Sequence, residues 1–100
     1  MELDALEEFN RRADEVLHYL WDPIGVAGKV MARDEYTGYV PTLMTLLKAN
    51  AAANTIADYL TEIRTKHMEL GPDRDKDNAT VKLLLQWKTK LEGTKPRILG

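Results

Sequence analysis

Two short stretches in the first half of the chain combine aromatic, acidic and basic side chains at close spacing. They are WDPIGV, from Trp21 to Val26, and RDEYTGYVP, from Arg33 to Pro41. Side chains of these kinds around an apolar pocket can orient a small ligand or bind a metal ion. A second candidate surface lies nearer the C-terminus, where a leucine and a tryptophan share one helix flank. The candidate binding residues are Trp21, Asp22, Arg33, Glu35, Tyr36, Tyr39, Leu83 and Trp87.

The same two stretches also carry ordinary folding signals. Asp22 precedes Pro23, and the residue before a proline avoids the helical region, so a helix must end here. Asp22 can then accept a hydrogen bond from a following backbone N–H, while Pro23 suits the first position of a new turn. Asp34 is a good N-cap, and Glu35 adds negative charge to the first turn of the next helix. The sequence favours this structural interpretation over a ligand site.

A run of alternating acids from Asp73 to Asn78 imitates part of a calcium-binding loop. Asp73, Asp75 and Asp77 match the first three ligand positions, but Asn78 stands where such a loop needs glycine. Leu84 stands where it needs a bidentate glutamate. We therefore expect a solvated loop that caps the following helix, and no metal site.

Nothing in the sequence completes a catalytic set around the two histidines. His67 lies on an apolar stripe near the end of its helix, which is typical of a packed boundary histidine. His18 lies off the stripe of its own helix, and we expect it to be solvated. The chain has no cysteine, and no nucleophile stands beside a base and an orienting acid. We expect no catalytic residue, no metal and no cofactor, and therefore a protein that is not an enzyme.

Composition narrows the classes of partner. One hundred residues suit one domain, and 14 basic against 16 acidic residues give a net charge of −2. This balance lacks the basic excess typical of nucleic-acid binding. No apolar run approaches the ~20 residues needed to cross a bilayer, and the acidic start MELDALEEFN is not a signal peptide. We expect a cytoplasmic protein that binds neither nucleic acid nor membrane.

Four segments show apolar residues at three- and four-residue steps. They predict helices over about 3–21, from 36 or 38 to 48, over 52–68, and from the acidic run to Gly93. No segment alternates like a strand. The predicted fold is all-α, a small antiparallel bundle of four helices with a Pro/Gly elbow between the first two helices. We expect one domain over residues 1–92 and an extended or mobile tail over residues 93–100.

Part of the sequence resembles a family of small bacterial helical proteins, the YugE-like proteins. The resemblance rests on WDPIG at Trp21–Gly25 followed by DEY at Asp34–Tyr36, and on IADYL at Ile56–Leu60. It covers roughly residues 15 to 70, and the TGYVP that follows DEY departs from the family pattern. The resemblance implies a helical fold and a bacterial origin. It carries no activity, because the family has no established function.

The last helix has more apolar surface than one buried stripe requires. Leu83 and Trp87 widen its apolar arc to about 200°, so this flank is either covered by the elbow and tail or is a contact surface. We expect a non-enzymatic protein that acts through protein contacts, as a homo-oligomer or as a small inhibitor- or immunity-type partner. The alternative is a small-ligand or metal-dependent activity in a pocket between the elbow of residues 22–35 and the second helix.

Overall fold

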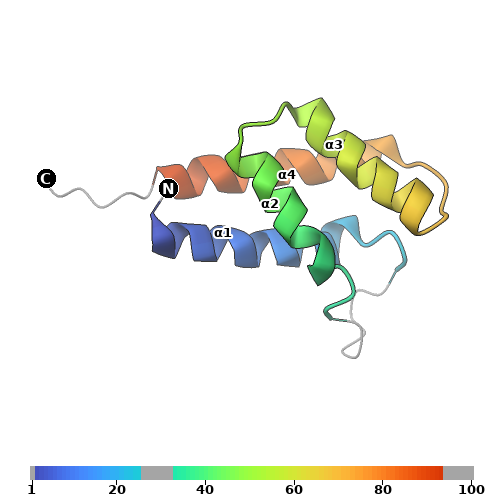
Figure 1. Ribbon diagram of the computed structural model, residues 1–100, viewed down its shortest axis with the longest axis horizontal. Coiled ribbons are helices and arrows are strands. Elements are labelled where there is room, and N and C mark those ends of the chain that lie inside the picture. The colour runs from blue at the N-terminus through green and yellow to red at the C-terminus, as the bar shows by residue number, and fades with distance from the viewer. Residues whose placement is uncertain (1, 26–32, 94–100) are drawn as a thin grey trace, which may run out of the picture.

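A computed structural model describes residues 2–25 and 33–93, and these residues form helices and no strands. Figure 1 shows their order along the chain. The predicted elbow residues 26–32 and tail residues 94–100 lie outside the described residues. The all-α fold and the small antiparallel bundle are confirmed. The four α-helices of the described residues are α1 Leu3–Val16, α2 Val40–Lys48, α3 Ala53–Glu62 and α4 Arg74–Glu92.

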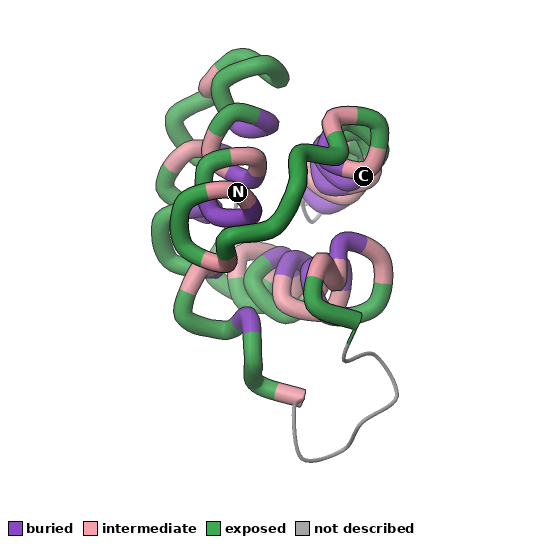
Figure 2. Tube along the Cα trace, turned by 90° about the vertical axis from the view of Figure 1, so that its right-hand side faces the viewer, coloured by how far each residue is buried: buried purple, intermediate pink, exposed green. Residues whose placement is uncertain are grey.

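The two longest helices, α1 and α4, pack along each other in opposite directions (Figure 1). Because of this pairing, the start of α1 lies beside the end of α4, where Phe9 and Lys88 border one surface depression. α3 packs on α4, and α2 contacts both α1 and α3. Figure 2 shows the buried residues on the sides of the helices that face one another.

The apolar stripes predicted from the sequence form one core. On α1 the fully buried positions Phe9 and Ala13 are four residues apart, as a single helix face requires. Leu43 and Leu47 on α2 show the same spacing and are also fully buried. The core is completed by side chains of the other elements: Val16, Leu17, Trp21, Tyr36, Val40, Met44, Ile56, Ala57, Leu60, Ile63, Val81, Leu84 and Leu91.

Helix ends follow the local sequence signals. Asp73 caps α4, since its side chain accepts a hydrogen bond of 3.1 Å from the backbone N–H of Lys76. Pro41 lies in the first turn of α2 after a 3₁₀ turn over Thr37–Tyr39, where a proline costs no helical hydrogen bond. After α2, Asn50 adopts a left-handed φ of 58°, a conformation that asparagine tolerates better than most residues.

Two of the helices continue into π-helical turns, Leu17–Trp21 after α1 and Ile63–His67 after α3. In the first, the backbone N–H of Asp22 bonds to the carbonyl of Leu17, five residues earlier. This wider turn shifts the phase of the helix, so that consecutive residues Leu17 and His18 both lie in the interior. The expectation that His18 is solvated is therefore wrong, because its side chain is only 2 % exposed.

One charged cluster lies in the interior, where the π-helical turns meet the start of α4. Asp77 is fully buried, and its Oδ1 accepts hydrogen bonds of 2.8 Å from Trp21 Nε1 and from Arg64 Nη2. Its Oδ2 accepts a third, of 2.7 Å, from the Thr61 hydroxyl. The expected solvated loop over Asp73–Asn78 is thus corrected at Asp77, which lies one turn inside α4 and faces the core.

Replacing Asp77 tests whether this cluster fixes the packing of the helices. Asp77→Ala leaves the buried Arg64 guanidinium and Trp21 N–H without their acceptor, and we expect a loss of about 3–5 kcal/mol in the free energy of unfolding. Asp75→Ala is the matched control, because Asp75 is exposed in the same first turn and should cost less than about 1 kcal/mol. Urea denaturation of both variants measures the difference, and equal losses would contradict the role assigned to Asp77.

Candidate functional site

The predicted elbow residues form a hydrogen-bonded corner in which Asp22 is the central acceptor. Asp22 leaves the helix with φ 29°, and its Oδ1 accepts from the backbone N–H of Gly25 at 3.1 Å. This confirms the predicted capping role of Asp22. The Tyr36 hydroxyl donates to the same Oδ1 at 2.7 Å and accepts from the backbone N–H of Ile24 at 3.1 Å. Tyr36 therefore ties the start of the elbow to the segment that precedes α2.

Two residues assigned to the candidate binding surface lie inside the protein. Trp21 and Tyr36 are each 1 % exposed, and their rings meet edge-to-face with centroids 5.5 Å apart. Burial, together with the hydrogen bond to the Asp22 carboxylate, raises the pKa of the Tyr36 hydroxyl far above its ordinary value. Both rings are part of the core and present no face to a ligand, which corrects their assignment to a surface.

The other elbow candidates lie apart from this corner. Arg33 pairs with Asp14 of α1 at 3.0 Å, and its guanidinium lies 5.4 Å from the centre of the Tyr19 ring. Glu35 is exposed. Tyr39 is half-buried, and its carbonyl accepts a hydrogen bond from the Tyr59 hydroxyl. These three residues face different neighbours and do not converge on one site.

Leu83 and Trp87 are half-buried on α4 and pack against the core. The Arg12 guanidinium of α1 lies 5.1 Å from the centre of the Trp87 ring, and the Lys90 ammonium lies 5.2 Å from it. Among the described residues, α1 therefore covers part of this flank, and two cations already occupy positions over the indole. The remaining depression beside Leu83 measures about 210 Å³.

The predicted pocket of the alternative function involves the elbow of residues 22–35, of which residues 26–32 lie outside the described residues. Between α1 and α2 a depression of about 230 Å³ is bordered by Asp14 and Thr37, among others, and by none of the candidate site residues. No group of three or more histidine or acidic side chains suited to a metal ion occurs within residues 2–25 and 33–93. The small-ligand alternative stays a prediction.

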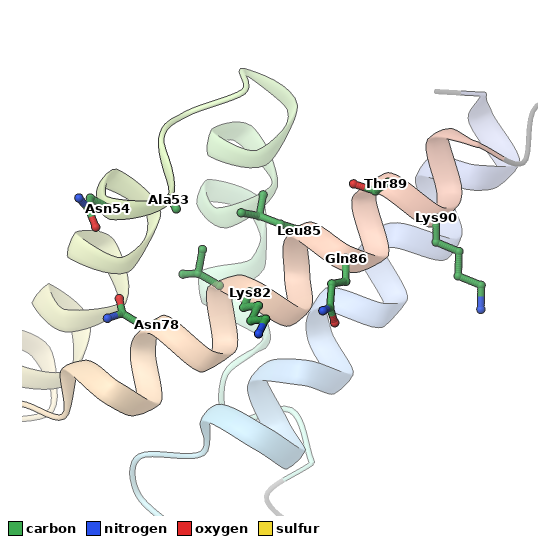
Figure 3. A pocket seen from close by; sticks show the side chains of 9 residues that line it. Ala53, Asn54, Asn78, Lys82, Leu85, Gln86, Thr89 and Lys90 are labelled. Atoms are coloured by element: carbon green, nitrogen blue, oxygen red, sulfur yellow. The ribbon is translucent and has the colours of Figure 1, made fainter.

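Another surface hollow lies along α4 beside the start of α3 (Figure 3), and its volume of about 750 Å³ exceeds that of either depression described above. Val81 and Leu85, one turn apart on α4, form its apolar floor together with Thr89. We name this hollow the α3–α4 groove. It is lined by Ala53, Asn54, Asn78, Val81, Lys82, Leu85, Gln86, Thr89 and Lys90.

The groove exists because α3 covers only the first half of α4. Every polar contact from the α3 segment to α4 involves Arg74 or Asp77, in the first turn of the 19-residue helix. Beyond the start of α3 at Ala53, no helix of the described residues covers the same side of α4. Helical periodicity predicts Val81 and Leu85 as apolar positions, but no sequence pattern indicates where α3 stops covering α4.

The groove is suited to noncovalent contact. Its walls offer aliphatic carbon, the side-chain amides of Asn54, Asn78 and Gln86, and two ammonium groups. Among its described lining residues it holds no histidine and no carboxylate.

Comparison with known proteins gave no match to a family model, to a curated protein or to a solved structure. The resemblance to the YugE-like proteins therefore stays a prediction. In the described parts of the chain, no helix combines the length and apolarity required to cross a membrane.

The Asp22 corner can be tested by a double-mutant cycle. We expect Asp22→Ala to lower the free energy of unfolding by about 1–2 kcal/mol, because the Gly25 N–H and the Tyr36 hydroxyl lose an acceptor. Tyr36→Phe removes one of the same bonds, so the two losses should be less than additive by about 1 kcal/mol. Chemical denaturation of the single and double variants measures this coupling. Strictly additive losses would show that the two side chains do not act together.

Alkaline titration tests the burial of Tyr36. Because burial raises the pKa of Tyr36 in the folded state above the ~10 of an unfolded tyrosine, its stabilising effect is complete below pH ~10 and is lost as the pH rises further. We expect the free energy of unfolding to fall above pH ~10, and to fall less steeply in Tyr36→Phe than in the wild type. Tyr19→Phe, at an exposed ring, should keep the wild-type slope. Equal slopes in all three proteins would contradict this account.

Proposed function

We propose that this protein is a non-enzymatic binding module that holds a helical segment of another protein in the α3–α4 groove. The observation that carries the proposal is the apolar floor of the groove, where half-buried Leu85 follows buried Val81 on the side of α4 that α3 packs against. A helix buries its apolar side against a neighbouring element, and α3 stops short of Leu85, whose side chain stays partly exposed.

A partner helix fits this place better than a small molecule does. The groove is shallow and runs along α4, and helices pack on one another at interaxial distances of about 8–10 Å through ridges of side chains. A segment placed beside Leu85 would extend the line of α3 and complete the helix layer on α4. This corresponds to the helix-in-groove mode of peptide recognition, in which apolar residues at three- and four-residue spacing are the anchors.

A second copy of the chain fits the groove less well. In a symmetric dimer the same patch lies on both subunits, so groove-to-groove packing would bring Lys82 and Lys90 of one copy near the same lysines of the other. Like charges across an interface disfavour association. This argument favours a different protein over self-association.

The inhibitor- or immunity-type role, the cytoplasmic location and the bacterial origin belong to the same proposal. They are supported by the sequence alone.

A peptide-display selection tests the proposal. The probes are helix-forming peptides about 18 residues long, with randomised residues along one face, selected on the immobilised protein. We expect enriched peptides to carry apolar residues at three- and four-residue steps. Thr89→Trp, which fills the groove from an exposed position, should weaken their binding by about tenfold or more.

The matched control is Thr45→Trp, at an exposed threonine of α2 outside the groove. It should leave binding unchanged. Failure to enrich any peptide, or equal binding to both variants, would overturn the proposal. A wild-type protein that forms a stable dimer in sedimentation, and loses it on Thr89→Trp alone, would replace the partner with a second copy of the chain.

A further inference from the structure

The charged residues that line the α3–α4 groove, among those described, are both lysines. Lys82 and Lys90 are exposed on α4. Neither forms an ion pair with a described residue, although the Lys90 ammonium lies over the Trp87 ring. By contrast, arginines elsewhere on the surface, such as Arg33 and Arg74, have carboxylate partners within 3.0 Å. The groove therefore keeps two positive charges that have no carboxylate partner among the described residues.

The two lysines lie on one edge of the groove. Residues 82, 86 and 90 are four apart, so they follow one line along α4, and Figure 3 shows Lys82, Gln86 and Lys90 projecting on the same side of the helix. Val81, Leu85 and Thr89 follow the neighbouring line and form the floor. The lysines are eight residue steps apart, and at 1.5 Å per step they are separated by about 12 Å along the axis.

We propose that the groove selects an acidic amphipathic helix, with carboxylates seven or eight residues apart along the edge that meets Lys82 and Lys90. This inference rests on the proposed function, since it specifies the partner of the same site. On a helix that lies nearly parallel to α4, two residues seven or eight positions apart lie on the same edge. Their separation along the axis is about 10.5 to 12 Å, close to that of the two lysines. Apolar side chains between the two carboxylates then meet Val81 and Leu85.

The positive edge is a local feature of the surface. The chain as a whole carries a net charge of −2, so a long-range field would not attract an acidic segment. Attraction arises within a Debye length of the two ammonium groups, which is about 8 Å at physiological salt. Charge at this edge therefore selects and orients the partner helix, while the apolar floor supplies most of the affinity.

Paired display libraries test the inference. Both contain helix-forming peptides of about 18 residues with the same randomised apolar positions, and they differ only at two edge positions seven residues apart. Glutamate occupies these positions in one library and lysine in the other. We expect enrichment from the glutamate library, and binding that weakens as NaCl rises from about 50 to about 500 mM.

Charge reversal supplies the second arm of the test. Lys82→Glu with Lys90→Glu should weaken the enriched glutamate peptides by about tenfold and should restore binding to the corresponding lysine peptides. Lys48→Glu with Lys66→Glu is the control, because it changes the net charge equally at exposed lysines outside the groove. This control should change the binding of neither the glutamate peptides nor the lysine peptides.

The outcomes separate the inference from the proposed function. One outcome is that peptides from both libraries are enriched equally, lose binding on Thr89→Trp and are unaffected by charge reversal. The groove would then still bind helices, but the inference of an acidic partner would be overturned. Failure to enrich peptides from either library would overturn both.

Discussion

The buried carboxylate of Asp77 is the constraint on which the arrangement of the helices depends. A fully buried charge is costly unless it is paired and hydrogen-bonded, and Asp77 has Arg64, Trp21 and Thr61 as its donors. These donors come from the end of the α1 segment and from the α3 segment, while Asp77 itself belongs to the start of α4. Only one relative placement of the three elements brings all the donors to the same carboxylate. Apolar packing alone tolerates helices that slide or rotate, so the cluster makes this placement specific.

The same constraint explains where the surface is open. Because Thr61 and Arg64 are held at Asp77, the α3 segment lies over the first turns of α4, and its start at Ala53 reaches only as far as the groove. α4 continues along α1 for several further turns, to Glu92. The second half of α4 therefore has α1 on one side and Asn50, just after α2, beside Lys88, while no helix of the described residues covers its groove side. The apolar floor of the groove follows from a short helix fixed at one end of a long one.

Helix positions could be predicted from the sequence, since apolar periodicity, Pro41, Asn50 and Asp73 act locally. The burial of His18 and of Asp77 could not. For His18, a π-helical turn shifts the phase that a regular helix would keep. For Asp77, the surrounding acidic residues predict a solvated loop. Its hydrogen-bond donors lie 13, 16 and 56 residues away in the chain, so no local pattern indicates them. For Trp21 and Tyr36, the residue type alone is ambiguous. The polar atom on each ring predicts a hydrogen-bond partner, but it does not show whether that partner lies in the core or outside the protein.

The division of polar groups between interior and surface bears on the kind of function the fold supports. Asp22, Tyr36, Asp77 and Arg64 could each take part in chemistry, but each of them already forms at least one hydrogen bond within the fold. Recruiting any of them to a substrate would first break a contact that stabilises the fold. In the α3–α4 groove no such conflict arises, because Leu85 stays partly exposed and neither Lys82 nor Lys90 forms an ion pair with a described residue. Such a surface gains free energy when a complementary chain covers it, and this gain is the physical basis of the binding function that we propose.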